Sequence, residues 1–315
     1  MNGGASVDAA GVAAAFRDAC RFDVLCFKPG NVSCESAGHG MEARDFLRSA
    51  AVSAAPIADP ALSVGERVRA AVRATRTAVG CNTNLGILLL AAPLARAAQL
   101  PAPTRLRERL VQVLSSLTVA DARAAFEAIR LAAPAGLGNA AAQDVRSPPS
   151  VDLREAMRLA AAQDQLAAQY VNDYAAVFDL GVDGLRQRLT EGASLADAAQ
   201  HVFLQFLCEI EDAHVVRKHG RVVAQWLRER ASQVASAGPA CNNPTQRHGL
   251  LQRFDSELKA RGVNPGTSAD FTVASLFALA LSVPPHSPAA RHDAQPGLAG
   301  AANTAPGKPL PGDAR

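Results

Sequence analysis

Apolar residues recur at helical spacing along almost the whole sequence, whereas the strict alternation of a β-strand is nearly absent. The segment after Ser194 illustrates the pattern, because Ser194 and Asp197 form a helix start signal ahead of one apolar stripe. That stripe consists of Leu195, Ala199, Val202, Phe203, Phe206 and Ile210. Abundant alanine and an aromatic content of only 4% also favour helix. The sequence therefore predicts an all-α fold, a multi-helix bundle with long polar inter-helix loops.

The periodic segments show where helices are expected. They lie near residues 6–26, 41–54, 61–80, 84–98, 103–116, 119–132, 152–178, 180–190, 195–210, 212–236, 247–261 and 268–282. The stretch 133–151, which contains several Gly and Pro residues, is either a linker between two helical halves or a functional loop. We expect an all-α catalytic domain over residues 1–283, with a possible internal break at this stretch. Residues 284–315, rich in Pro, Ala and Gly, are expected to be a disordered tail.

The charge balance and the cysteines narrow the class of protein. Lys and Arg total 32 against 29 Asp and Glu, and a net charge of +3 gives no reason to expect nucleic acid or a membrane as a partner. The six cysteines include no CxxC pair and are interpreted as reduced thiols. The longest apolar runs, 85–95 and 271–281, are too short to span a bilayer. We therefore expect a cytoplasmic protein that acts on small molecules, with a homodimer as one possible assembly.

A polar stretch that ends in an acid directly precedes the apolar segment 271–281. Thr267 is a natural helix N-cap, and Asp270 follows three residues later, as in a variant capping box. A helix start behind a loop that contains Gly is also an anion site, where a carboxylate could hold a divalent metal that bridges phosphates. Capping and ligand binding both remain open for this loop.

A second long polar loop occupies residues 28–46. Lys28 lies beside a turn that contains Gly, which suits contact with phosphate. His39 is a candidate for proton transfer, because Glu35 and Asp45 are close to it in the sequence. The alternative is an ordinary loop that leads into the next helix.

A third loop, 81–90, places several polar side chains at the start of a strongly apolar helix. Asn82 or Thr83 can cap that helix. Together with Asn84 they can instead offer hydrogen-bond donors to an anion or a ribose.

The fourth loop, 209–220, is rich in charge. On a continuous helix Glu209 and Asp212 would share a face, and they could ligate Mg²⁺ through oxygen. Arg217 and Lys218 would then face phosphates, although a solvated charged surface is the alternative.

The sequence contains no Walker loop, no GxGxxG after a strand, and no HExxH or GxSxG motif. Any chemistry must therefore be assembled from the polar loops on an all-α frame. Acids, bases, Asn, Thr and Gly at helix starts suit a nucleotide with Mg²⁺ better than an acyl or peptide substrate.

Taken in order, these loops match a set of family motifs. The matching segments are Lys28-Pro29-Gly30-Asn31-Val32, His39 with Met41, Asp45-Phe46 with Ser49-Ala50, Asn82-Thr83-Asn84-Leu85-Gly86, and Asn264-Pro265-Gly266-Thr267-Ser268-Ala269-Asp270. In this combination, over residues 20–283, the chain resembles the triphosphoribosyl-dephospho-CoA synthase family. The resemblance implies an all-α transferase that moves the triphosphoribosyl group of ATP onto the 2′-hydroxyl of 3′-dephospho-CoA and releases adenine. Its product would be the precursor of the prosthetic group of acyl carrier subunits.

For that reaction we expect Mg²⁺ and cations to hold the triphosphate, a carboxylate to stabilise positive charge on the ribose, and a base to accept a proton. The candidate catalytic residues are His39, Glu35, Asp212 and Asp270. The candidates for nucleotide or phosphate binding are Lys28, Gly30, Asn31, Asn82, Thr83, Asn84, Arg217, Lys218, Gly266, Thr267 and Ser268. The candidate metal ligands are Asp212, Asp270 and Glu209.

Three segments depart from the family's usual pattern. Asn84 and Leu85 stand where the family has a basic pair. The segment 136–145 replaces a Gly-Arg-Gly-Glu block and offers only Asp144 as an acid, and 217–220 reads Arg-Lys-His-Gly instead of Arg-Gly-Gly. The form seen here is similar to a divergent branch. The alternative functions are a related ribosyl or phosphoribosyl transferase of methanopterin-type, one-carbon cofactor biosynthesis, and an inactive all-α nucleotide-binding or scaffold protein.

Overall fold

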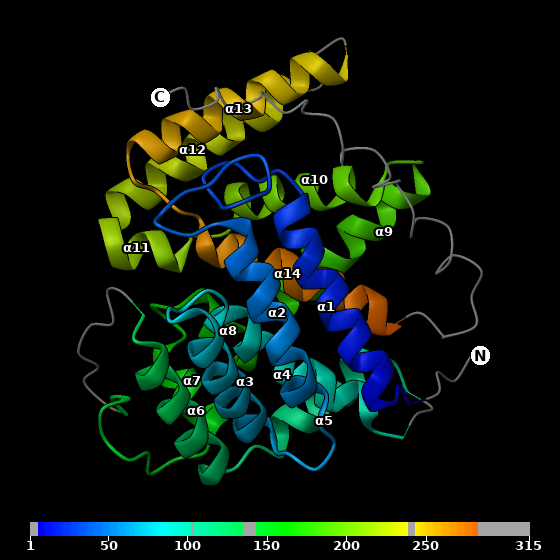
Figure 1. The fold of residues 1–315 in the computed structure, drawn as a ribbon, viewed down its shortest axis with the longest axis vertical. Coiled ribbons are helices and arrows are strands. Elements are labelled where there is room, and N and C mark those ends of the chain that lie inside the picture. The colour runs from blue at the N-terminus through cyan, green and yellow to red at the C-terminus, as the bar shows by residue number, and fades with distance from the viewer. Residues whose placement is uncertain (1–5, 102–103, 135–142, 239–242, 283–315) are drawn as a thin grey trace, which may run out of the picture. The chain divides into compact units, whose positions relative to one another are not determined.

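The computed structural model describes residues 6–101, 104–134, 143–238 and 243–282, and within these ranges the chain is helical (Figure 1). The first helices are α1 (Ala9–Leu25), α2 (Ala43–Ala58), α3 (Val64–Val79), α4 (Leu85–Gln99), α5 (Leu106–Ser115) and α6 (Val119–Ala132). They are followed by α7 (Leu153–Ala160), α8 (Gln165–Val171), the π-helical segment η1 (Ala176–Val182), α9 (Asp183–Thr190) and α10 (Leu195–Glu209). The last are α11 (Ala213–His219), α12 (Arg221–Ala237), α13 (Pro244–Ala260) and α14 (Gly266–Ser282). The predicted all-α fold is confirmed.

Helix α14 forms the centre of the fold. It is apolar around nearly its whole circumference and packs against α1, α4, α10 and η1 (Figure 1). A helix that is apolar on all sides needs neighbours on all sides. Gly181 of η1 allows one of these contacts, because a Cβ there would lie 1.9 Å from Oγ of Ser275 in α14.

Helices α3 and α6 run side by side in the same direction. The N–H of Gly65, in the first turn of α3, donates to Oδ1 of Asp121 in the first turn of α6, at 2.9 Å. Further along, Arg69 and Arg73 of α3 both pair with Glu127 of α6. The two helices therefore keep this register, and their C-terminal ends also lie next to each other.

Two predicted helices are interrupted. The single helix expected over 152–178 is wrong, because Asp164 caps a new helix through the N–H of Leu166, at 2.9 Å. Asp173 and Tyr174 then adopt left-handed φ angles of 55° and 59°, which end that helix. The helix expected over 212–236 is also wrong as one piece, because Gly220, with φ of 85°, separates α11 from α12.

The described helices belong to one compact unit, which also contains 143–151, the larger described part of the stretch where an internal break was predicted. None of these helices combines the length and the hydropathy that a membrane span requires. The predicted disordered tail, 284–315, lies outside the described residues. The homodimer and the cytoplasmic location stay predictions.

Candidate functional site

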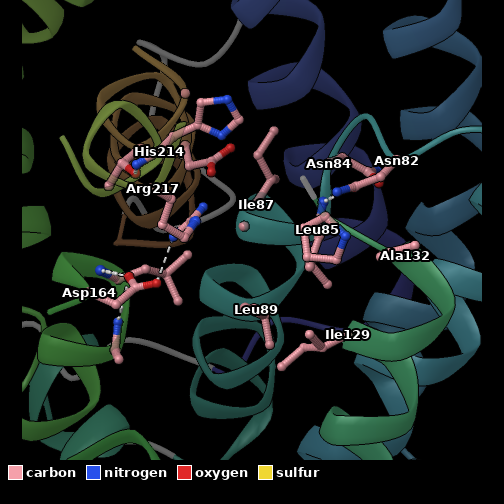
Figure 2. A pocket seen from close by; sticks show the side chains of 18 of the residues that line it. Asn82, Asn84, Leu85, Ile87, Leu89, Ile129, Ala132, Asp164, His214 and Arg217 are labelled. Carbon is pink, nitrogen blue, oxygen red and sulfur yellow. Dashed lines mark hydrogen bonds and ion pairs between the residues drawn. The ribbon is translucent and has the colours of Figure 1, made fainter. Parts of the chain in front are cut away.

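A cavity of about 1360 Å³ opens among the starts of α4, α8, α11 and α14, the loop 26–42 and the ends of α3, α6 and α7 (Figure 2). All four polar loops of the sequence contribute to its wall. The predicted site residues that line it are Asn31, His39, Asn82, Thr83, Asn84, Arg217, Lys218, Gly266, Thr267 and Asp270. The structure therefore brings together loops that are far apart in the chain.

Asp270 lies near the start of α14 and presents its carboxylate to this cavity. The carboxylate lies directly against the backbone of Gly86, since a Cβ at that glycine would fall 2.0 Å from Oδ2. No hydrogen bond or ion pair joins it to another described residue. Burial raises the pKa of Asp270 well above its usual range, and the negative charges of Asp23 and Asp212 raise it further. A cation bound beside Asp270 would offset these effects, because an opposite charge favours the ionised form of a carboxyl group.

Asp23, on α1, is the acid that acts most strongly on Asp270, and it also lines the cavity. Its Oδ1 lies 2.8 Å from Nζ of Lys28, and Lys28 also donates to the backbone carbonyl of Asp23. Sequence reasoning missed Asp23. The signal was present, because Asp23 continues the buried stripe of Phe16 and Cys20 on α1, where a charge is unexpected.

Lys28 and Gly30, predicted to contact phosphate, lie outside the cavity wall. Lys28 is fully buried, and its charge is matched by Asp23. The N–H of Gly30 donates to Oδ1 of Asp255 in α13, at 2.8 Å. Glu35 is also outside the cavity, because it pairs with His248 of α13 at 3.2 Å. These three residues hold the loop 26–42 in place.

Asp212 is buried and accepts hydrogen bonds at the starts of two helices, α11 and α14. Its Oδ1 accepts from the N–H of Val215, at 3.1 Å, which caps α11. Its Oδ2 accepts from both the N–H and the Oγ of Ser268, each at 2.9 Å, which satisfies the start of α14. The predicted Thr267 cap of α14 is therefore wrong, since the helix begins at Gly266 and Oγ1 of Thr267 accepts from the N–H of His214. Neither Asp212 nor Ser268 lines the cavity.

Glu209 does not share a helical face with Asp212, so that expectation is wrong. Helix α10 ends at Glu209, which is exposed, and α11 begins only at Ala213. The described residues contain no cluster of three or more His, Cys, Asp or Glu side chains that could hold a metal ion. A divalent ion at Asp270 and Asp23 would need further oxygen ligands from a bound phosphate.

Two histidines line the cavity, one of which sequence reasoning missed. His39 adopts a left-handed φ of 57°, and its Nε2 donates to the carbonyl of Gly30 at 3.0 Å, which leaves Nδ1 to accept a proton. His214 packs its ring over Gly266. Burial lowers the pKa of His214, and nearby Arg217 adds to that effect against the opposing charge of Asp212. The imidazole of His214 is therefore neutral at physiological pH.

The cavity also has a cationic side, and two helix starts, those of α4 and α14, contribute to its wall. Arg217 pairs with Oδ2 of Asp164 at 2.8 Å, and Figure 2 shows both side chains on the wall. The side chain of Asn82 accepts from the N–H of Leu85 at 3.1 Å, which is one of its two predicted roles. The N-terminal ends of α4 and α14 both face this space. Their dipoles favour an anion there.

The opposite side of the cavity is apolar. In Figure 2, Ile129 and Ala132 of α6 lie across from His214, Arg217 and Asp164, with side chains of α4 between them. The other apolar residues of this side are Phe126 of α6 and Ala156, Met157, Leu159 and Ala160 of α7. The cavity thus has one polar, charged end and one apolar end.

Comparisons with known proteins agree with this picture. Residues 9–287 match the model of a family described as CitG, ATP:dephospho-CoA triphosphoribosyl transferase. A crystal structure of an Archaeoglobus fulgidus protein, provisionally described as a triphosphoribosyl-dephospho-CoA synthase, superposes with a TM-score of 0.57 at 23% identity. The match covers 75% of this chain and 98% of that one, and at this identity it supports the fold. No curated protein matches the sequence.

Proposed function

Because the chain belongs to the family of ATP:dephospho-CoA triphosphoribosyl transferases, we propose that the reaction takes place at the polar end of the cavity described above. The protein is a transferase that moves the triphosphoribosyl group of ATP to 3′-dephospho-CoA. The bond between the ribose C1 and the adenine of ATP breaks, and a bond from that carbon to the 2′-oxygen of dephospho-CoA forms. The 2′-hydroxyl loses a proton, and the departing adenine gains one.

Asp270 and Asp23 are assigned to stabilise the positive charge that develops on the ribose and to hold Mg²⁺. Cleavage of the bond to adenine leaves positive charge on the ribose, which the carboxylate of Asp270 would stabilise, whereas Asp23 also pairs with Lys28. The same oxygens suit Mg²⁺, which prefers one or two carboxylates together with phosphate oxygens and water. Bound there, Mg²⁺ would neutralise the triphosphate and orient it. Asp212 and Glu209 are less suited, since the first is engaged in capping and the second lies outside the cavity.

The triphosphate of ATP is assigned to the N-terminal ends of α4 and α14, together with Arg217 and Lys218. Backbone N–H groups at a helix start, Asn82 and Asn84 beside them, and two cations provide the donors that phosphate oxygens need. Arg217 would exchange its pairing with Asp164 for a phosphate.

His214 is assigned as the base that accepts the proton of the 2′-hydroxyl. Its imidazole is neutral, as a base must be, and it lies on the same wall as Asp270. His39, with Nδ1 left free, is the second candidate, whereas Glu35 points to His248 and away from the cavity.

One observation carries this assignment. The carboxylate of Asp270 faces the cavity without a protein partner, at the place where two helix starts meet. Such an arrangement costs stability unless a ligand uses it.

Adenine release tests the function directly. Purified protein is incubated with ATP and Mg²⁺, with and without 3′-dephospho-CoA, and adenine is measured by chromatography. We expect adenine only when dephospho-CoA is present, and none from the Asp270→Asn variant. A full rate from that variant would remove Asp270 from the chemistry. If no adenine forms with dephospho-CoA although Mg²⁺-ATP raises the melting temperature, the acceptor is a different one and pterin precursors would be screened.

A further inference from the structure

The cavity is larger than one nucleotide requires. Its volume of about 1360 Å³ exceeds the roughly 300–1,000 Å³ that is usual for a small-molecule site. The proposed function fills the polar end with ATP. The apolar end, between α6 and α7, is then left for a different chemical group.

Leu159 marks the outer edge of this apolar end. It lies on α7, lines the cavity and leaves 44% of its surface exposed. A single exposed leucine is ordinary on a protein surface. Met157 of the same helix and Ile129 of α6 also line the cavity. Leu159 is exposed and Met157 is almost fully buried, so these three apolar side chains extend along the cavity wall from the solvent inward, and we call them the apolar path.

Arg76 lies beside this path. Because α3 and α6 run in parallel and in register, Arg76 near the end of α3 lies next to the end of α6, which carries Ile129. Arg76 lines the cavity, and its guanidinium has no hydrogen bond or ion pair to another described residue. Arg69 and Arg73, earlier on the same helix, are both paired with Glu127. Arg76 is therefore a cation available to a ligand.

We propose that this end of the cavity is the subsite for dephospho-CoA, an inference that rests on the proposed function. Arg76 binds the diphosphate of the acceptor, and the path of Ile129, Met157 and Leu159 receives its pantetheine arm. That arm is a long chain of methyl and methylene groups with one hydroxyl, two amides and a terminal thiol, so it suits a largely apolar passage that opens to solvent. With the arm in this position, the adenosine of dephospho-CoA and its 2′-hydroxyl point toward the polar end of the cavity, where ATP is placed.

Steady-state kinetics with two acceptors test the subsite. ADP carries the adenosine and the diphosphate of dephospho-CoA but lacks the arm. We expect Leu159→Ser to raise the KM for dephospho-CoA about five-fold, the scale of a partly buried leucine contact. The KM for ATP and the rate with ADP as acceptor should not change. Arg76→Gln should lower kcat/KM about ten-fold for both acceptors, because both carry the diphosphate.

Leu189→Ser is the matched control, since Leu189 lies on α9 outside the cavity wall and is 37% exposed. It should leave all of these constants unchanged. The subsite is overturned if Leu159→Ser changes the constants no more than the control does, or if the wild type uses ADP as well as dephospho-CoA. These outcomes can be distinguished from a failure of the proposed function. In that case the wild type would release no adenine with dephospho-CoA at all.

Discussion

The backbone of Gly86 and the carboxylate of Asp270 touch, so that a side chain at position 86 would occupy the space of the carboxylate. Gly86 lies in the first turn of α4, and Asp270 lies near the start of α14. Two helix starts from distant parts of the chain are thereby brought around one acid. The glycine is needed here for space, since it lies within a helix and has an ordinary helical φ.

Gly86→Ala should therefore reduce turnover strongly. The added methyl group displaces Asp270, and a shift of about 1 Å in a catalytic group costs roughly a hundred-fold in rate. The control is Gly238→Ala, because a Cβ at Gly238 meets no atom within 4 Å. Adenine release and circular dichroism would be compared for both variants. An active Gly86→Ala enzyme would contradict the placement of Asp270.

Asp270→Asn should raise the stability of the ligand-free protein while abolishing activity. The pKa of Asp270 is raised in the folded state, so its ionisation destabilises the fold as the pH rises from the unfolded value through the folded value. The melting temperature of the variant should exceed that of the wild type at pH 8, and the difference should shrink toward pH 4. Mg²⁺-ATP should stabilise the wild type more than the variant. A variant that is less stable at pH 8 would show that the carboxylate has a favourable partner.

Asp212→Asn should lower stability without acting on the chemistry directly. An amide offers one oxygen in place of two, so the N–H of either Val215 or Ser268 loses its partner. The expected cost is about 1–3 kcal/mol in the free energy of unfolding, measured with urea. Glu209→Gln, at an exposed position, should stay within about 0.5 kcal/mol of the wild type. Equal stability of the two variants would contradict the double cap.

The acid limb of the profile of kcat/KM against pH should reflect the protonation of His214. Burial lowers the pKa of His214 in the folded protein, so the neutral base persists below the usual histidine value of about 6.5. As the pH decreases, kcat/KM should begin to fall only below about pH 6.5. The free energy of unfolding should also decrease below that pH, because protonation of His214 is less favourable in the folded protein than in the unfolded one. His214→Asn should lower kcat/KM by about a hundred-fold or more and remove the limb. A limb that survives in His214→Asn would point to His39 as the base.

Gly30→Ala and Gly40→Ala form a matched pair in the loop 26–42. Both glycines have left-handed φ angles, 80° and 73°, so alanine strains both backbones by about 1 kcal/mol. Only at Gly30 would the new Cβ also collide, lying 2.8 Å from Cδ1 of Leu258, whereas Gly40 has no atom within 4 Å. We expect Gly30→Ala to be the less stable variant and the one that loosens the loop, as measured by urea unfolding and by proteolysis. Equal losses would show that α13 does not hold the loop at Gly30.

Local signals in the sequence predicted much of the fold. The expected helix 119–132 matches α6, because the side chains of Thr118 and Asp121 cap it within one turn. The helix expected over 152–178 failed, since its interruptions depend on Asp164 as a cap and on left-handed residues that periodicity does not reveal. Here an N-cap and two left-handed residues interrupt a segment whose apolar period alone predicts one helix.

The candidate site was predictable only in part. The polar loops are visible in the sequence, and ten of their named residues do line one cavity. Asp23 was missed although its place in the apolar stripe of α1 was a signal, whereas nothing local distinguishes Arg76 on α3 from a solvated charge. The role of Asp212 depends on Ser268, 56 residues further along the chain. No local pattern contains that contact.

The central position of α14 also governs how the molecule reaches its active form. This helix is the last described element of the chain, yet it fills the middle of the bundle and carries Asp270. During synthesis, the helices that surround it emerge from the ribosome without the element that completes their core. The contacts that hold the loop 26–42 in place also join residues that are distant in sequence, as in the hydrogen bond from Gly30 to Asp255 across 225 positions. Folding is therefore expected to be slow for an all-α chain, and a nascent chain that lacks α14 has no catalytic site.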